Sequence, residues 1–417
     1  MVSEGSVTTV LGEADVRRLV GEAVEGLGLD GKRVLVIIPD HSRSGPTHWF
    51  FRALADRLGS RVAQLDFLIA LGTHPPLSEA RINEFLHLTP AERSGKYANI
   101  EILNHRWDDP AALVSVGSVS AERVAEISGG RMTDAVPVRL NKRILDYDHL
   151  LISGPVFPHE VVGFSGGHKY LFPGIAAPDI INATHWLGAL ITNAAINGTR
   201  DTPVRALIEE AASMVPVERH CLAYVVDPGG VRGLFAGPVL DAWQAAAALS
   251  AEVNVRYHER PYHTVLSCAP PMYDDIWTAG KCMYKLEPVV ADGGRLIIYA
   301  PHISEVSVSH GKVIEAIGYH CRDFFLQQWE RYVRYPGGVL AHSTHVKGCG
   351  TFEDGVETPR VEVVLATRIP RAVCEKINLG YCDPDTIDPA EYANREAEGV
   401  LYVAKAGEIL HRLRDAR

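Results

Sequence analysis

Residues 32–43 read KRVLVIIPDHSR, a β-branched apolar run that ends in four polar residues. A short apolar run rich in Val and Ile is typical of a strand that is buried on both faces. A second such run, at 62–71, ends in GTHPP at 72–76. Helical patterns at 15–28 and 46–58 precede these two runs. The alternation of helix and strand predicts an α/β fold.

The same pattern continues along the chain. Further strands are predicted at 98–103, 135–140, 148–153 and 221–227, with helices between them. A second set follows Arg260-Pro261, with strands at 263–269, 294–300 and 361–367, helices at 276–290 and near 304–333, and a closing strand and helix over 399–415. Because 417 residues are too many for one core, we expect two α/β domains with mixed or parallel sheets, residues 1–258 and 259–417.

Composition narrows the class of partner. The chain is 47% hydrophobic and 22% charged, as soluble globular proteins are. Its net charge of -10 and its lack of a basic run argue against nucleic acid, which is held by clustered Lys and Arg. No apolar stretch reaches the roughly 20 residues that span a bilayer. The seven cysteines show no C-x-x-C spacing and are expected to be buried or free thiols. We therefore expect a cytoplasmic protein that binds a small molecule.

Polar residues follow several of the predicted strands. DHSR at 40–43 and GTHPP at 72–76 come first, followed by Asn104-His105 and then His159, just past Gly154-Pro155. Ligands of open α/β sheets bind at the carboxyl ends of the strands. Any one of these histidines alone could be a turn former, but the set indicates a functional site.

The stretch at 158–186, PHEVVGFSGGHKYLFPGIAAPDIINATHW, adds a second feature. Its glycine-rich loop, Ser165, Gly166 and Gly167, lets backbone N–H groups approach an anion, and Lys169 follows closely. The spacing is not that of a P-loop. A lysine beside such a loop can instead serve as a covalent anchor. His185, near the start of a helix that opens after Pro178, offers one imidazole, so it makes a metal site only if a cofactor supplies the other ligands.

Taken together and in order, these motifs resemble the nickel-dependent lactate racemase family, LarA and its homologues. The resemblance also includes FPGIA at 172–176 and, in the second half, WTAGKCMYKLEP and ADGGRLIIYAP. It implies two α/β domains with the active site in the cleft between them. It also implies a nickel-pincer nucleotide, the nickel complex of pyridinium-3,5-bisthiocarboxylic acid mononucleotide, which is bound to a lysine as a thioamide and is made by separate enzymes.

The resemblance also implies roles for individual residues. Lys169 would be the covalent anchor and His185 the fourth nickel ligand, while the loop Ser165, Gly166 and Gly167 and, in part, Asp40 would bind or orient the cofactor. His74 and His159 would be the acid/base pair, and Arg43, Tyr284 and Lys285 would contact a 2-hydroxycarboxylate substrate. The implied reaction is racemisation or epimerisation through reversible hydride transfer and a planar 2-keto acid.

Two departures from the family pattern bear on these expectations. Residue 168 is His where Pro or Arg is expected, which we interpret as a change in loop packing. Lys285 and Pro288 stand where the lactate enzyme pattern has Gln and Lys, and Lys281 and His302 add further polar groups. These differences predict a substrate larger or more polar than lactate, unless Lys281 and Lys285 form a solvated helix face.

Two other classes of function remain open at the level of the sequence. One is a zinc-dependent hydrolase that uses His74, His159 and His185 as ligands. The other is a non-catalytic protein that binds the nickel nucleotide, in which the acid/base histidines would have no task.

Overall fold

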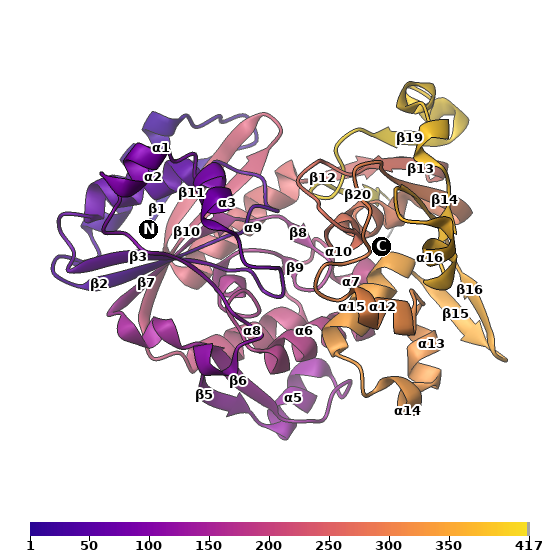
Figure 1. Ribbon diagram of the computed structural model, residues 1–417, viewed down its shortest axis with the longest axis horizontal. Helices are drawn as coiled ribbons and strands as arrows, with labels where there is room; N and C mark the ends of the chain where they lie inside the picture. Colours follow the sequence, from indigo (N-terminus) through magenta and orange to yellow (C-terminus); the bar gives the residue numbers. More distant parts are fainter. Residues whose placement is uncertain (415–417) are drawn as a thin grey trace. The chain divides into compact units, whose positions relative to one another are not determined.

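The computed structural model describes residues 1–414, which form two compact α/β units (Figure 1). One unit comprises Met1–Phe157, Phe164–Ile181 and Arg205–Val253, and the other comprises Pro158–Gly163, Asn182–Val204 and the chain from Asn254 onward. The chain passes into the second unit for the last time between Val253 and Asn254, close to the expected boundary at 258/259. Two earlier segments also belong to the second unit. The second half of helix α6 (Pro178–Ile191) explains part of this difference, because Trp186 and Ala189 pack into the second core.

The first unit is built on a seven-stranded mixed sheet with the order β1-β11-β10-β7-β2-β3-β4. The strands are β1 (Val2–Gly5), β2 (Arg33–Ile38), β3 (Gln64–Ile69), β4 (Ile102–Asn104), β7 (His149–Pro155), β10 (Glu218–Asp227) and β11 (Gly230–Pro238). The run from β10 to β4 is parallel, whereas β11 pairs antiparallel with both β10 and β1. The predicted α/β class with a mixed sheet is confirmed.

Helices cover both faces of this sheet, which explains why β2 is apolar from Val34 to Ile38. The helices are α1 (Glu13–Glu25), α2 (Thr47–Leu58), α3 (Glu79–Phe85), α4 (Pro90–Ser94), α5 (Ala121–Ser128), α8 (Pro203–Ser213) and α9 (Val239–Val253). Val34, Val36 and Ile38 share one core with α1 and α2, while Leu35 and Ile37 are buried on the opposite face. A strand enclosed on both sides buries every residue, as the sequence pattern predicted.

The expected strand at 135–140 forms, but outside the main sheet. It is β6 (Val136–Asn141), which pairs antiparallel with β5 (Leu113–Val119) in a separate two-stranded sheet. Along β6 the buried residues Val136 and Val138 alternate with less buried neighbours. Such alternation belongs to a strand with one solvated face rather than to a central strand.

The second unit contains a five-stranded, entirely parallel sheet with the order β18-β17-β14-β13-β19. Its strands are β13 (Tyr262–Cys268), β14 (Val290–Ala300), β17 (Glu362–Thr367), β18 (Gly380–Tyr381) and β19 (Val400–Val403). Smaller pairs are β12 (Val255–His258) with β20 (Leu410–Leu413) and β15 (Gly350–Glu353) with β16 (Val356–Pro359). The short strands β8 (Pro158–His159) and β9 (Gly163–Phe164) also pair.

The helical segments of this half are short. They are α7 (Asn193–Ile196), α10 (Ile276–Ala279), α11 (Lys281–Tyr284), α12 (Gly311–Ile317), α13 (Arg322–Gln327), α14 (Trp329–Tyr332), α15 (Gly337–Lys347) and α16 (Arg371–Lys376). The single helix predicted at 276–290 is wrong, because Gly280 separates α10 from α11 and β14 already begins at Val290. The closing helix is also wrong over the described residues, since β20 forms there and pairs with β12.

Two further sequence expectations can be compared with the structure. All seven cysteines are free thiols, as predicted, and five of them are buried. Within residues 1–414, the structure contains no helix of the length and apolar character needed to cross a membrane.

Candidate functional site

Asp40 and His74 meet at the carboxyl ends of two neighbouring strands of the first unit. β2 ends at Ile38 and β3 at Ile69, and the polar residues follow directly. The Nδ1–H of His74 donates to the Asp40 carboxylate, whose other oxygen accepts from the backbone N–H of Ser42 at 3.1 Å and from its hydroxyl at 2.7 Å. Because a carboxylate only accepts, the neutral His74 ring carries its proton on Nδ1 and a lone pair on Nε2. This arrangement suits His74 to act as a general base.

The loop that carries His74 is fixed by backbone contacts within the same unit. The N–H of Gly72 donates to the carbonyl of Gly174 at 2.8 Å, which joins the GTHPP loop to the FPGIA segment. Gly72 has φ +57, a left-handed conformation that favours glycine. Arg43 belongs to the same polar turn as Asp40, since its N–H donates to the Asp40 carbonyl at 3.4 Å. The structure therefore brings Asp40, Arg43 and His74 together beyond the carboxyl ends of β2 and β3.

His105, at a third strand end, has a structural role instead. The side-chain amide of Asn141 donates to its Nδ1 at 3.2 Å, and its Nε2 donates to the carbonyl of Ala176 at 3.0 Å. Burial lowers the pKa of His105 to about 4. Its neighbour Asn104 bonds both backbone groups of Leu77. These two residues hold the loops that surround the site.

The glycine-rich loop is shaped by the protein itself. The Ser165 hydroxyl accepts from the Phe157 N–H at 2.9 Å and donates to the Pro155 carbonyl at 3.2 Å. Gly166 and Gly167 have φ +87 and +59, and a Cβ on Gly166 would lie 2.6 Å from the side chain of Val156. A side chain at either glycine would be strained. Both glycines are therefore required for the loop to adopt this path.

Lys169 lies in the single 3-10 turn Gly167–Tyr170 that follows the loop, and its side chain is partly exposed. Its backbone N–H donates to the Gly166 carbonyl at 3.3 Å. The lysine thus sits directly on the turn that the glycines create.

His168, the departure from the family pattern, packs behind this turn. Its Nε2 accepts from Arg219 at 3.0 Å, because a guanidinium only donates, and its Nδ1–H donates to Glu209 at 2.6 Å. Burial alone would raise the pKa of Glu209, but the hydrogen bond from His168 and the nearby Arg205 and Arg219 lower it overall. These contacts support the interpretation that residue 168 alters the packing of the loop.

Arg205, a buried residue of α8, anchors the loop and was missed by sequence reasoning. Its guanidinium donates to the carbonyls of Phe164 and Gly166, the latter at 3.3 Å, and lies 4.1 Å from the Trp243 ring centroid. Burial lowers the pKa of Arg205 to about 10, so the group stays charged at neutral pH. The only signal in the sequence is one arginine on the apolar side of a helix.

The second unit carries the other predicted residues, His159, His185, Tyr284 and Lys285. The Val161 N–H donates to Nδ1 of His159 at 3.1 Å, so the neutral ring carries its proton on Nε2. Glu160 lies 3.3 Å from the same nitrogen and can accept a proton that Nδ1 holds when the ring is charged. Only the charged ring can give up a proton from Nε2, and the Glu160 carboxylate beside Nδ1 stabilises that charged form.

The segment around His159 is held by Lys285. The ammonium of Lys285 donates to the carbonyl of Pro158. Lys281 and Lys285 are only 7% and 2% exposed, and the Lys281 ammonium lies 4.6 Å from the Tyr273 ring. The alternative of a solvated helix face is therefore wrong. The carbonyl of Tyr284 accepts from Asn193 at 3.0 Å, while His185 lies on α6 and is partly exposed.

The chain is thus an α/β protein with polar residues gathered at the strand ends of its first unit. Solved structures of similar fold are known. The lactate racemase apoprotein from Thermoanaerobacterium thermosaccharolyticum has the same fold, with a TM-score of 0.70 and 19% identity over 95% of this chain and 93% of that one. A Thermotoga maritima protein of known crystal structure is 32% identical, with a TM-score of 0.89 over 97% of this chain and 99% of that one.

Sequence relatives agree. Residues 16–198 match the lactate racemase N-terminal domain family. The chain is 30% identical to the lactate racemase of Lactiplantibacillus plantarum over 39% of its length, and 26% identical to that of T. thermosaccharolyticum over 67%. The matched segments span 35% and 61% of those two relatives. These matches support a relationship to the lactate racemase family, which the family model shows directly for residues 16–198.

Proposed function

We propose that this chain is a racemase or epimerase of a 2-hydroxycarboxylic acid that works with a lysine-bound nickel-pincer nucleotide. The observation that carries the proposal is the contact between His74 and Asp40 at the strand ends of a lactate racemase family fold. The contact leaves a lone pair on the exposed side of an imidazole, which is what removal of a hydroxyl proton requires.

The residues present fit the proposed cofactor. Lys169 stands on a turn whose two glycines have left-handed φ values, so the backbone around the amine is fixed. His185 offers one imidazole, which is sufficient where the nucleotide supplies two sulfurs and a carbon, a soft planar donor set that suits Ni(II). In this proposal Lys169 holds the nucleotide and His185 completes the nickel site. When bound, the cofactor accepts a hydride from the substrate's α-carbon and returns it.

In this proposal His74 and His159 transfer the proton of the substrate hydroxyl group. Nε2 of His74 takes the hydroxyl proton as the α-hydride leaves, and the substrate becomes a planar 2-keto acid. Return of the hydride to the opposite face requires a proton on the former carbonyl oxygen, which Nε2–H of His159 supplies from its charged, imidazolium form, leaving a neutral ring. Two contacts support this division of roles: the Asp40 carboxylate accepts from Nδ1–H of His74, and Glu160 lies 3.3 Å from Nδ1 of His159, where it stabilises the charged ring. Arg43 binds the substrate carboxylate, for which the planar guanidinium is well suited.

The proposed substrate is larger or more polar than lactate. Pro288 carries no amine at a position where the lactate enzyme pattern has Lys, so a small pocket would lose one of its closing groups. Racemisation of lactate, malate, aryl-lactates and aldonic acids by the nickel-loaded protein tests this. A kcat/KM for lactate that exceeds all others by tenfold, about 1.4 kcal/mol in transition-state binding, would contradict the substrate proposal.

The cofactor proposal has its own test, the intact mass of protein co-expressed with the cofactor-making enzymes. We expect a covalent adduct that Lys169→Ala abolishes. His185→Ala should keep the adduct but lose nickel, as measured by metal analysis. An adduct on another lysine would contradict the assignment, and a zinc content with no adduct would favour a hydrolase instead.

A further inference from the structure

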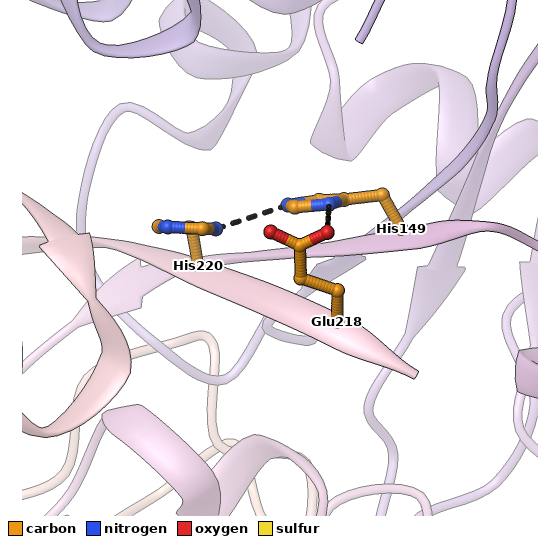
Figure 2. A group of neighbouring side chains, drawn as sticks. All are labelled: His149, Glu218 and His220. Atoms are coloured by element: carbon orange, nitrogen blue, oxygen red, sulfur yellow. Dashed lines mark hydrogen bonds and ion pairs between the residues drawn. The ribbon is translucent and has the colours of Figure 1, made fainter. Parts of the chain in front are cut away.

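A group of potential metal ligands lies in the first unit, at the amino-terminal ends of β7 and β10. His149 is the first residue of β7, and Glu218 and His220 lie at the start of β10. β7 and β10 are parallel, with Glu218 opposite His149. Because residues two apart on a strand face the same side, all three side chains project from one face of the sheet. Figure 2 shows the two imidazole rings side by side, with the carboxylate next to both.

The donor atoms of this group are close together. One ligand atom from each residue lies within 4.8 Å of the other two. Nε2 of His149 is 3.1 Å from Nδ1 of His220, and its Nδ1 is 3.6 Å from a Glu218 oxygen (Figure 2). Ligands about 2.0–2.2 Å from a tetrahedral zinc ion are themselves roughly 3.3–3.6 Å apart. The two distances start from different nitrogens of His149, only one of which can bind the ion, so side-chain rotations must bring three ligand atoms that now lie within 4.8 Å of one another to this spacing.

His149 also carries an unsatisfied polar atom. Its side chain is fully buried, and its Nδ1 has no hydrogen-bond partner. A buried polar nitrogen without a partner is costly, and a nearby cation removes that cost. Burial lowers the pKa of both His149 and His220, so both rings are neutral at pH 7, the form that binds metal.

We propose that His149, Glu218 and His220 bind one divalent transition-metal ion, best matched by zinc, with water in the remaining position. Two imidazoles and one carboxylate are an established zinc donor set. The ion would join the beginnings of β7 and β10. Lys32 is a cation beside the group; its ammonium lies 3.8 Å from Glu218 and its side chain is 36% exposed, so it can move aside.

This group lies at the opposite ends of the strands from Asp40 and His74. β2 and β7 are parallel, with Val34 opposite His149, whereas Asp40 lies beyond the other end of β2. Six residues of strand at about 3.3 Å each separate the two levels by roughly 20 Å. Zinc at the amino-terminal ends of the strands would therefore not contact the acid/base residue His74 at their carboxyl ends.

Zinc binding by the full-length chain tests the proposal. The protein is made without the cofactor-synthesising enzymes, stripped with EDTA and dialysed against zinc, with metal content measured per chain. We expect one zinc ion in the parent and in His185→Ala. We also expect a melting temperature that rises by about 5–10 °C when zinc is near 100 times its Kd.

Variants at the exposed side of the group identify the ligands without disturbing the buried His149. His220→Ala should weaken zinc binding at least 100-fold and Glu218→Gln about tenfold, with circular dichroism unchanged. Lys32→Met, the matched control, should bind zinc at least as tightly as the parent because it removes only a competing cation. No zinc bound by the parent, or parent-like binding by His220→Ala, would overturn the proposal.

Discussion

Arg205 should be essential for the path of the glycine-rich loop, and Arg205→Met tests this. The variant keeps an apolar side chain of similar length but removes the guanidinium donor from the buried carbonyls of Phe164 and Gly166, of which Gly166 keeps the 3.3 Å bond from the Lys169 N–H. Each unsatisfied buried acceptor costs about 1–3 kcal/mol, and the contact with Trp243 adds about 1–2 kcal/mol. Allowing for the apolar burial of methionine, we expect the first unit to lose about 3–5 kcal/mol.

Hydrogen exchange measured by mass spectrometry reports this loss where it arises. Peptides that cover residues 164–170 should exchange at least about 100-fold faster in Arg205→Met, which corresponds to the lower end of that range. Arg205→Lys should be intermediate, because an ammonium keeps the charge but cannot span both carbonyls.

Arg139→Met is a suitable control because Arg139 pairs with Asp179 while 40% exposed, and surface pairs contribute less than about 1 kcal/mol. If Arg205→Met and the control protected the loop equally well, the role assigned to Arg205 would be wrong. Within the proposed function, Arg205→Met should also lower the yield of adduct on Lys169.

Three further predictions concern the same unit and the proton-transfer pair. Gly166→Ala should cost about 2–4 kcal/mol in denaturant unfolding, from left-handed strain plus overpacking, whereas Gly28→Ala, with φ +59 but open space, should cost only about 1–2. Burial lowers the folded-state pKa of His105 to about 4, so the unfolded chain binds more protons than the folded chain below about pH 6.5. The free energy of unfolding should therefore fall by about 3 kcal/mol from this group between about pH 6.5 and pH 4. An equal dependence of the free energy of unfolding on pH in His105→Gln and in the parent would contradict this. Replacing His74 or His159 with Ala should stop racemisation, while one enantiomer should still be oxidised in a single turnover; near-parental turnover in both directions would exclude the two-histidine scheme.

The strands of the first sheet could be predicted because local sequence and burial agree there. Residues 34–38 are apolar without interruption, and a run of that kind has few other stable environments. The same logic placed Asp40 and His74 at neighbouring strand ends, where the structure brings them into contact. Parallel pairing of consecutive strands was sufficient for that inference.

What could not be predicted depends on partners distant in the sequence. His105 resembles a site residue until Asn141 and Ala176 take both of its ring nitrogens. Arg205 has no motif, and its role exists only because Phe164 and Gly166 turn their carbonyls toward α8. Likewise, the short helices after Asp275 are set by packing in the second core and not by a helical periodicity of the local sequence.

The chain passes between its two units five times, after Phe157, Gly163, Ile181, Val204 and Val253. One of those passages occurs inside helix α6, so the helix cannot be cut without breaking its backbone hydrogen bonds. Gene fusions that join relatives at residue 254 would therefore exchange only part of the second unit, leaving residues 158–163 and 182–204 from the other parent. Because the second unit is built from three separate segments, relatives should diverge along the whole chain rather than exchange single domains. Designed chimeras should exchange all three segments of the second unit together.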